Sequence, residues 1–126
     1  MTGYTIDQVE EMLNKIAEEI PEDFYRELNG GILLLPEIKL HPKGKGDLYI
    51  MGEYCNTVNL GRYINIYYGS FMRVYGNVPE DLLYEKLKET LLHEFTHHLE
   101  SLAGARDLEI KDEIKLNEYH RRIKGH

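Results

Sequence analysis

The sequence has one cysteine, a deficit of basic residues and no long apolar run, and each shortage excludes a class of protein. Cys55 is the only cysteine, so no intrachain disulfide can form, which fits a reducing cytoplasm. The 15 Lys and Arg face 22 Asp and Glu, and no basic stripe is present to meet phosphates. No apolar run approaches membrane-spanning length, and the amino terminus lacks a basic segment followed by an apolar one. We therefore expect a cytoplasmic protein without a nucleic acid or membrane partner.

The one segment that indicates a chemistry is residues 93–98, His-Glu-Phe-Thr-His-His. His93, Glu94 and His97 form the His-Glu-x-x-His signature of a zinc hydrolase. On a helix, residues four apart lie one turn above one another, so the two imidazoles can share a metal ion at roughly 2.0–2.1 Å per nitrogen. Glu94 lies about 100° round the helix, where it can take a proton from a metal-bound water. The spacing predicts metal-assisted hydrolysis with Zn²⁺ as the cofactor.

The motif needs a helix, and residues 79–103 are predicted to form one. Asn77 can cap it, Pro79 suits its first turn, and Gly104 is a stop signal. Apolar residues recur through it at helical spacing: Leu87, Leu91, Phe95, Leu99 and Leu102. This stripe is centred roughly 160° from the two histidines. One face should therefore pack on a core while the opposite face presents the imidazoles to a cleft.

Three other residues are interpreted as structural. His98 falls on the apolar arc of the helix and is expected to be a hydrogen-bonded packing residue that supports the site. Cys55 has no second thiol nearby, so we interpret it as structural rather than as a ligand or nucleophile. The short run around His41 is interpreted as part of a solvated loop, residues 41–46.

The remaining patterns predict a single α+β domain over residues 1–126. Helices are expected at residues 5–20, ended by Pro21, and as a short turn at 22–28. Strands are expected at 32–35, 47–54 and 62–68, and residues 69–77 lead into the motif helix. An extended piece at 106–110 and a last helix at 112–122 follow. The order predicts a small mixed or antiparallel sheet of about three strands beside the motif helix, with helices flanking it at both ends.

Two imidazoles do not complete a catalytic zinc site, which usually has three protein ligands and an open position. His120 and His126 belong to a late helix and to the end of the chain. The acidic residues after Gly104 are better placed, because the chain must double back past the site: Asp107, Glu109, Asp112 and Glu113.

The chain resembles the small single-domain bacterial zincin-like metallopeptidases. The likeness is carried by the amino-terminal helix ending in Pro21 and by residues 28–32, 60–63, 68–71 and 90–98. The resemblance implies a zinc-dependent peptidase in which His93 and His97 bind metal and Glu94 is the general base. Compact relatives have Gly three residues after the second His and an acidic ligand three residues later, whereas Gly104 lies seven residues after His97. Asp112 is therefore ranked first as the third ligand, then Glu109 and Asp107.

The expected activity is hydrolysis of peptide or unfolded protein substrates, with strand 62–68, or the strand pairing with it, offering an edge to an extended chain. Four residues are candidates to stabilise the oxyanion: Tyr67, Tyr68, Tyr119 and His120. An alternative is a module that holds zinc and recognises a peptide or protein without cutting it. A structural protein with a chance motif is the third hypothesis.

Overall fold

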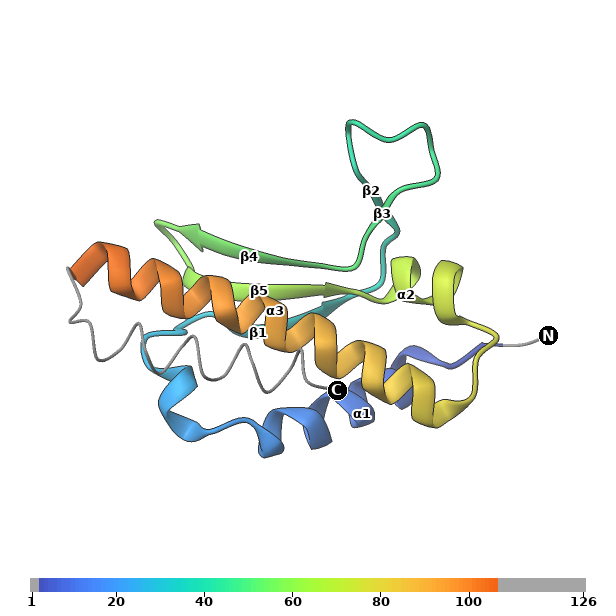
Figure 1. Cartoon of the computed structure of the whole chain (residues 1–126), viewed down its shortest axis with the longest axis horizontal. Helices are drawn as coiled ribbons and strands as arrows, with labels where there is room; N and C mark the ends of the chain where they lie inside the picture. Colours follow the sequence, from blue (N-terminus) through green and yellow to red (C-terminus); the bar gives the residue numbers. More distant parts are fainter. Residues whose placement is uncertain (1–2, 107–126) are drawn as a thin grey trace.

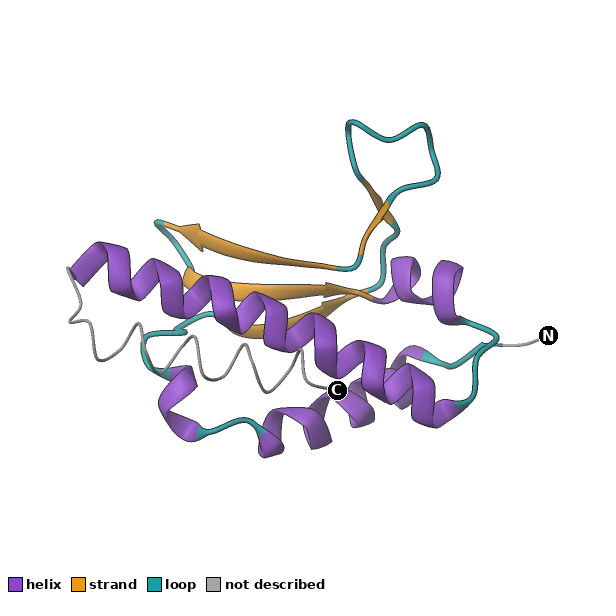
Figure 2. Cartoon of the chain, in the orientation of Figure 1, coloured by secondary structure: helices purple, strands orange, loops and turns teal. Residues whose placement is uncertain are grey.

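A computed structural model of the protein describes residues 3–106. In chain order they form α1 (Ile6–Glu19), the 3-10 helix η1 (Glu22–Tyr25), β1 (Gly31–Leu35), β2 (Lys39–Leu40), β3 (Tyr49–Ile50), β4 (Gly52–Thr57), β5 (Gly61–Tyr67), α2 (Tyr68–Tyr75) and α3 (Glu80–Arg106). Figures 1 and 2 show α3 running along the sheet, with the loop between β2 and β3 projecting away from the other elements. The predicted α+β class with a small mixed sheet is confirmed for the described residues.

The main sheet has the strand order β1-β5-β4. β5 is central: it pairs with β1 in parallel and with β4 in antiparallel orientation. The prediction that strand 62–68 could itself offer a free edge is wrong, because both of its edges are occupied. β4, which pairs with β5 on the side opposite β1, is an edge strand of this sheet. The prediction of one strand over 47–54 is also wrong, since the chain leaves the β2–β3 hairpin after Ile50 and joins the main sheet at Gly52.

Local sequence signals account for α1. The Thr5 hydroxyl accepts the Gln8 backbone N–H at 3.1 Å, and the Gln8 side chain accepts the Thr5 N–H at 2.8 Å. This capping box satisfies two of the backbone donors that a helix start leaves without partners. The helix ends just before Pro21, as predicted, and it buries Val9, Leu13 and Ile16, which recur at helical spacing.

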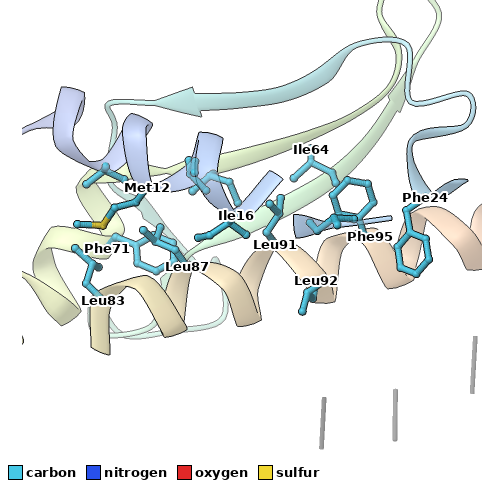
Figure 3. Packing of buried hydrophobic residues seen from close by; sticks show 14 of the residues in the cluster. Met12, Ile16, Phe24, Ile64, Phe71, Leu83, Leu87, Leu91, Leu92 and Phe95 are labelled. Atoms are coloured by element: carbon cyan, nitrogen blue, oxygen red, sulfur yellow. The ribbon is translucent and has the colours of Figure 1, made fainter. Parts of the chain in front are cut away.

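The core lies between α1, α3 and one face of the sheet (Figure 3). Helix α3 contributes residues of at most 1% exposure along nearly its whole length: Leu83, Leu87, Leu91, Phe95 and Leu102. Ile64 and Ile66 from β5, both 0% exposed, meet them. The predicted apolar stripe of the motif helix is therefore confirmed. Among residues 3–106, no helix has both the length and the apolar character needed to cross a membrane.

The predicted helix stop at Gly104 is wrong, because α3 continues to Arg106. Gly104 is exposed, and a Cβ there would meet nothing within 4 Å. One glycine disfavours a helix by only about 1 kcal/mol, which does not terminate a long, well-anchored helix. Arg106 is thus helical rather than extended, and the rest of the predicted segments 106–110 and 112–122 lies outside the described residues.

The sequence predicts residues 69–77 only as a connection, yet most of them belong to α2. The helix is short and its cap has no side-chain hydrogen bond, so the usual start signal is missing. Phe71, 0% exposed, anchors it to the core. Tertiary burial rather than local sequence explains this helix.

Replacing a buried leucine of α3 should cost far more stability than replacing an exposed one. We expect Leu87→Ala to lower the free energy of unfolding by about 2–5 kcal/mol, because the cavity in a fully buried stripe cannot refill. Leu82→Ala, at a position 38% exposed on the same helix, should cost below about 1 kcal/mol. Urea unfolding followed by circular dichroism measures both. Equal losses for the two variants would contradict the assigned faces of α3.

Candidate metal centre

His93 and His97 lie one turn apart on the exposed side of α3. Their Nε2 atoms are 3.1 Å apart, and the rings meet edge to face at 86°. Two nitrogens bound to one zinc ion at roughly 2.0–2.1 Å each can be no more than about 4.2 Å apart. The pair therefore fits a single shared ion, and at this distance one imidazole can also donate its N–H to the other.

Glu94 differs from His93 and His97, which are exposed, because its own exposure is only 6%. Burial raises the pKa of its carboxyl to about 7, with Glu53 adding to the rise and His97 opposing it. A carboxyl with such a pKa can accept and release a proton near neutral pH. Two imidazole nitrogens that could bind a metal ion and a carboxyl that could accept a proton are thus brought together beside one cleft.

A cleft of about 680 Å³ opens beside these residues. Its lining from α3 is His93, Glu94, His97, Glu100 and Ser101, and its lining from the opposite side is His41, Ile50, Gly52, Glu53 and Tyr54. A second hollow of about 480 Å³ continues past His93 and Glu94 towards Glu89 and Thr90. The two hollows share four residues, so together they form a groove that extends to both sides of the motif.

The edge of β4 forms one wall of this groove. Gly52, Glu53 and Tyr54 are consecutive residues, and side chains along a strand alternate between the two faces of the sheet, so Glu53 and Tyr54 point to opposite faces. A groove lined by all three residues therefore runs along β4, which is an edge strand of the described sheet. Gly52 allows α3 to approach this closely, because a Cβ there would lie 2.9 Å from Cγ2 of Thr90.

His98 is a packing residue, as predicted. It is fully buried, its Nε2 lies 2.8 Å from the Arg26 carbonyl, and its Nδ1 lies 2.9 Å from the Tyr54 hydroxyl. A carbonyl can only accept, so Nε2 carries the proton and Tyr54 donates to Nδ1. Burial lowers the pKa of His98, which favours this neutral form. The bond holds Tyr54, a residue of the cleft wall, against α3.

Of the four predicted oxyanion candidates, the two that the structure describes, Tyr67 and Tyr68, do not line the cleft. The Tyr67 hydroxyl donates to Glu53 at 2.6 Å, and the Tyr68 hydroxyl donates to the Tyr4 carbonyl. Neither lines the groove beside the motif. Tyr119 and His120 lie outside the described residues.

The predicted candidates for a third metal ligand also lie outside what the structure describes. Asp112, Glu109 and Asp107 all follow Arg106, the last described residue. Within residues 3–106, no third His, Cys, Asp or Glu joins the histidine pair in a group that could hold a metal ion. The ranking of the three acids assumes a turn at Gly104, and that premise is wrong.

Sequence reasoning misses several residues of the cleft. The sequence predicts a solvated loop around His41, but this residue lines the cleft from the start of the β2–β3 hairpin. No local signal brings a hairpin residue to a helix more than fifty positions away. Glu100 has a signal, because a residue three positions after His97 shares its side of the helix.

Comparison with known proteins identifies a family but no activity. No protein-family model and no curated protein matches the chain. Among solved structures it is similar to a conserved hypothetical protein from Thermus thermophilus, with 39% identity and a TM-score of 0.70. The match covers 80% of this chain and 99% of that one. The chain therefore belongs to the same family as that protein.

The cluster of Glu53, Lys39 and Tyr67 next to the cleft should make stability depend on pH. Burial by itself raises the pKa of Glu53, but hydrogen bonds from Lys39, at 2.7 Å, and Tyr67 lower it below its usual value of 4.5. Because the folded pKa is lowered, the ionised carboxylate stabilises the fold above about pH 4.5, and this contribution is lost as the pH falls through the folded pKa.

We therefore expect Glu53→Gln to reduce the free energy of unfolding at neutral pH by below about 1 kcal/mol, because the pair is partly exposed. The difference from wild type should shrink as the pH is lowered below about 4.5. Urea unfolding across this range measures it, with Glu10→Gln, an exposed residue of α1, as the matched control. A difference that stays constant or grows on acidification would contradict the assignment.

Proposed function

We propose that the protein is a zinc-dependent metallopeptidase of the zincin-like class. The observation that carries the proposal is the 3.1 Å approach of the His93 and His97 Nε2 atoms at a cleft, with the buried Glu94 carboxyl beside them. In this proposal His93 and His97 bind Zn²⁺, and Asp112, Glu109 and Asp107 remain the candidates for the third ligand. The single cysteine supports a reducing cytoplasm as the compartment.

When bound, zinc would lower the pKa of a water molecule towards about 7 and polarise a carbonyl group. Glu94 would take the proton of the attacking water on its carboxylate and pass it to the leaving amine. The burial that raises the pKa of Glu94 to about 7 suits both steps, because the same group must accept and then release a proton. The exposed imidazoles leave the cleft side open for substrate.

The groove supports a peptide or unfolded protein segment as the substrate. It extends to both sides of Glu94, so residues before and after a scissile bond could be held at once. The edge of β4 can pair with an extended chain through main-chain hydrogen bonds, which are independent of side-chain identity. The groove therefore supports recognition of backbone conformation more than of a particular sequence.

Purified protein should bind close to one equivalent of zinc, and His97→Ala should abolish tight binding, because a single imidazole remains. Metal content after reconstitution and dialysis measures this, and Glu85→Ala, an exposed change two turns before His93, should leave it unchanged. The proposal would be contradicted if the wild-type protein did not retain close to one equivalent of zinc. It would also be contradicted if the H97A variant retained as much zinc as the wild-type protein.

Glu94→Gln should keep zinc but lose peptide turnover by about 10²–10⁴-fold, because the proton acceptor is removed while the histidines stay. The assay is cleavage of a library of unstructured peptides by mass spectrometry, with Glu85→Gln as the control of equal charge change. Should zinc-loaded wild type cut no peptide in the library, the protein would instead be a zinc-binding recognition module.

A further inference from the structure

Beside the histidine pair lies a carboxylate that the proposed mechanism does not use. Glu100, one turn after His97 on α3, has its Oε1 atom 3.4 Å from Nδ1 of His97. The opposite ring nitrogen, Nε2, faces Nε2 of His93 at 3.1 Å. His97 is therefore placed between its partner imidazole on one side and an acidic side chain on the other.

We propose that Glu100 is a positioning residue that accepts the Nδ1–H of His97 and so directs its Nε2 lone pair to the metal. The inference rests on the proposed zinc site. An ionised carboxylate can only accept hydrogen bonds, so it selects the tautomer with the proton on Nδ1. That tautomer leaves Nε2 unprotonated, which is the form that binds a metal.

The helix fixes this arrangement more firmly than a loop would. Glu100 and His97 are three residues apart within α3, and side chains at that spacing are neighbours on the helix surface. The present 3.4 Å separation is longer than a good N–H···O hydrogen bond of about 2.7–3.2 Å. Both side chains are about half exposed, 47% and 53%, so a small rotation can close the gap.

The position three residues after His93 does not hold a carboxylate. The residue there is Thr96, which is buried and donates its hydroxyl to the Leu92 carbonyl at 3.0 Å. The effect of Glu100 should appear as metal affinity and not as fold stability, because the Glu100–His97 pair is about half exposed and contributes little to folding.

Zinc affinity of the full chain tests the role, measured by competition with a chromophoric chelator. We expect Glu100→Ala to weaken zinc binding by about 10-fold, the lower end for loss of a carboxylate that orients a metal-binding histidine, since the pair is exposed. Glu100→Gln should stay within about 3-fold of wild type, because the amide oxygen still accepts the Nδ1–H. Glu85→Ala and Glu85→Gln control for the loss of one negative charge from the same helix.

The comparison of the two Glu100 variants distinguishes a hydrogen-bond acceptor that positions His97 from a carboxylate that acts through its charge or by binding the metal directly. Equal weakening in E100Q and E100A would overturn the inference, since direct ligation or the field of the carboxylate would then explain the loss. Unchanged affinity in both variants would also overturn it. Either outcome leaves the proposed function intact, because wild type still binds zinc. If wild type binds no zinc and His97→Ala changes nothing, the proposed function itself fails.

Discussion

Burial of one face of α3 is the constraint on which the rest of the structure depends. Five apolar residues of this helix, from Leu83 to Leu102, are at most 1% exposed, and the helix packs against α1, β4 and β5. Burying each such side chain contributes roughly 1.5–3 kcal/mol. A rotation of the helix about its axis would expose this stripe, so its angular position is fixed. Because the angular position of the helix is fixed, His93 and His97 face the cleft.

A second constraint sets the width of that cleft. The chain leaves the β2–β3 hairpin after Ile50 and enters the main sheet at Gly52, beside α3. Because Gly52 has no side chain, Thr90 of α3 can approach β4 closely. Tyr54, two residues after Gly52, is hydrogen-bonded to His98 of the same helix. These two contacts hold the edge of β4 alongside the histidine pair. The groove is thus a consequence of packing between α3 and β4.

The sequence predicts this architecture where the signal is local and periodic. The capping box at Thr5 and the repeated apolar spacing of α1 and α3 locate both helices, and that spacing also places His98 among packed residues. The signal fails where tertiary contacts decide. Gly104 predicts a stop, but a long helix anchored at Leu102 continues through it. The position of His41 at the cleft depends on where the β2–β3 hairpin is placed relative to α3, which no short-range pattern encodes.

The burial of Glu94 is unfavourable for folding stability but suits the proposed proton transfer. Burial of a carboxyl that can ionise is costly, and the rise of its pKa to about 7 expresses that cost. The positions around it on the inner side of α3, Leu91 and Phe95, are fully buried and apolar, so a hydrophobic residue would pack there without this penalty. Natural proteins sit near a stability threshold and tolerate such a residue most often where activity requires it. The paired imidazoles beside it are exposed and contribute little to the core. The burial of this acid next to two exposed imidazoles therefore supports its proposed role as a proton acceptor at a metal site.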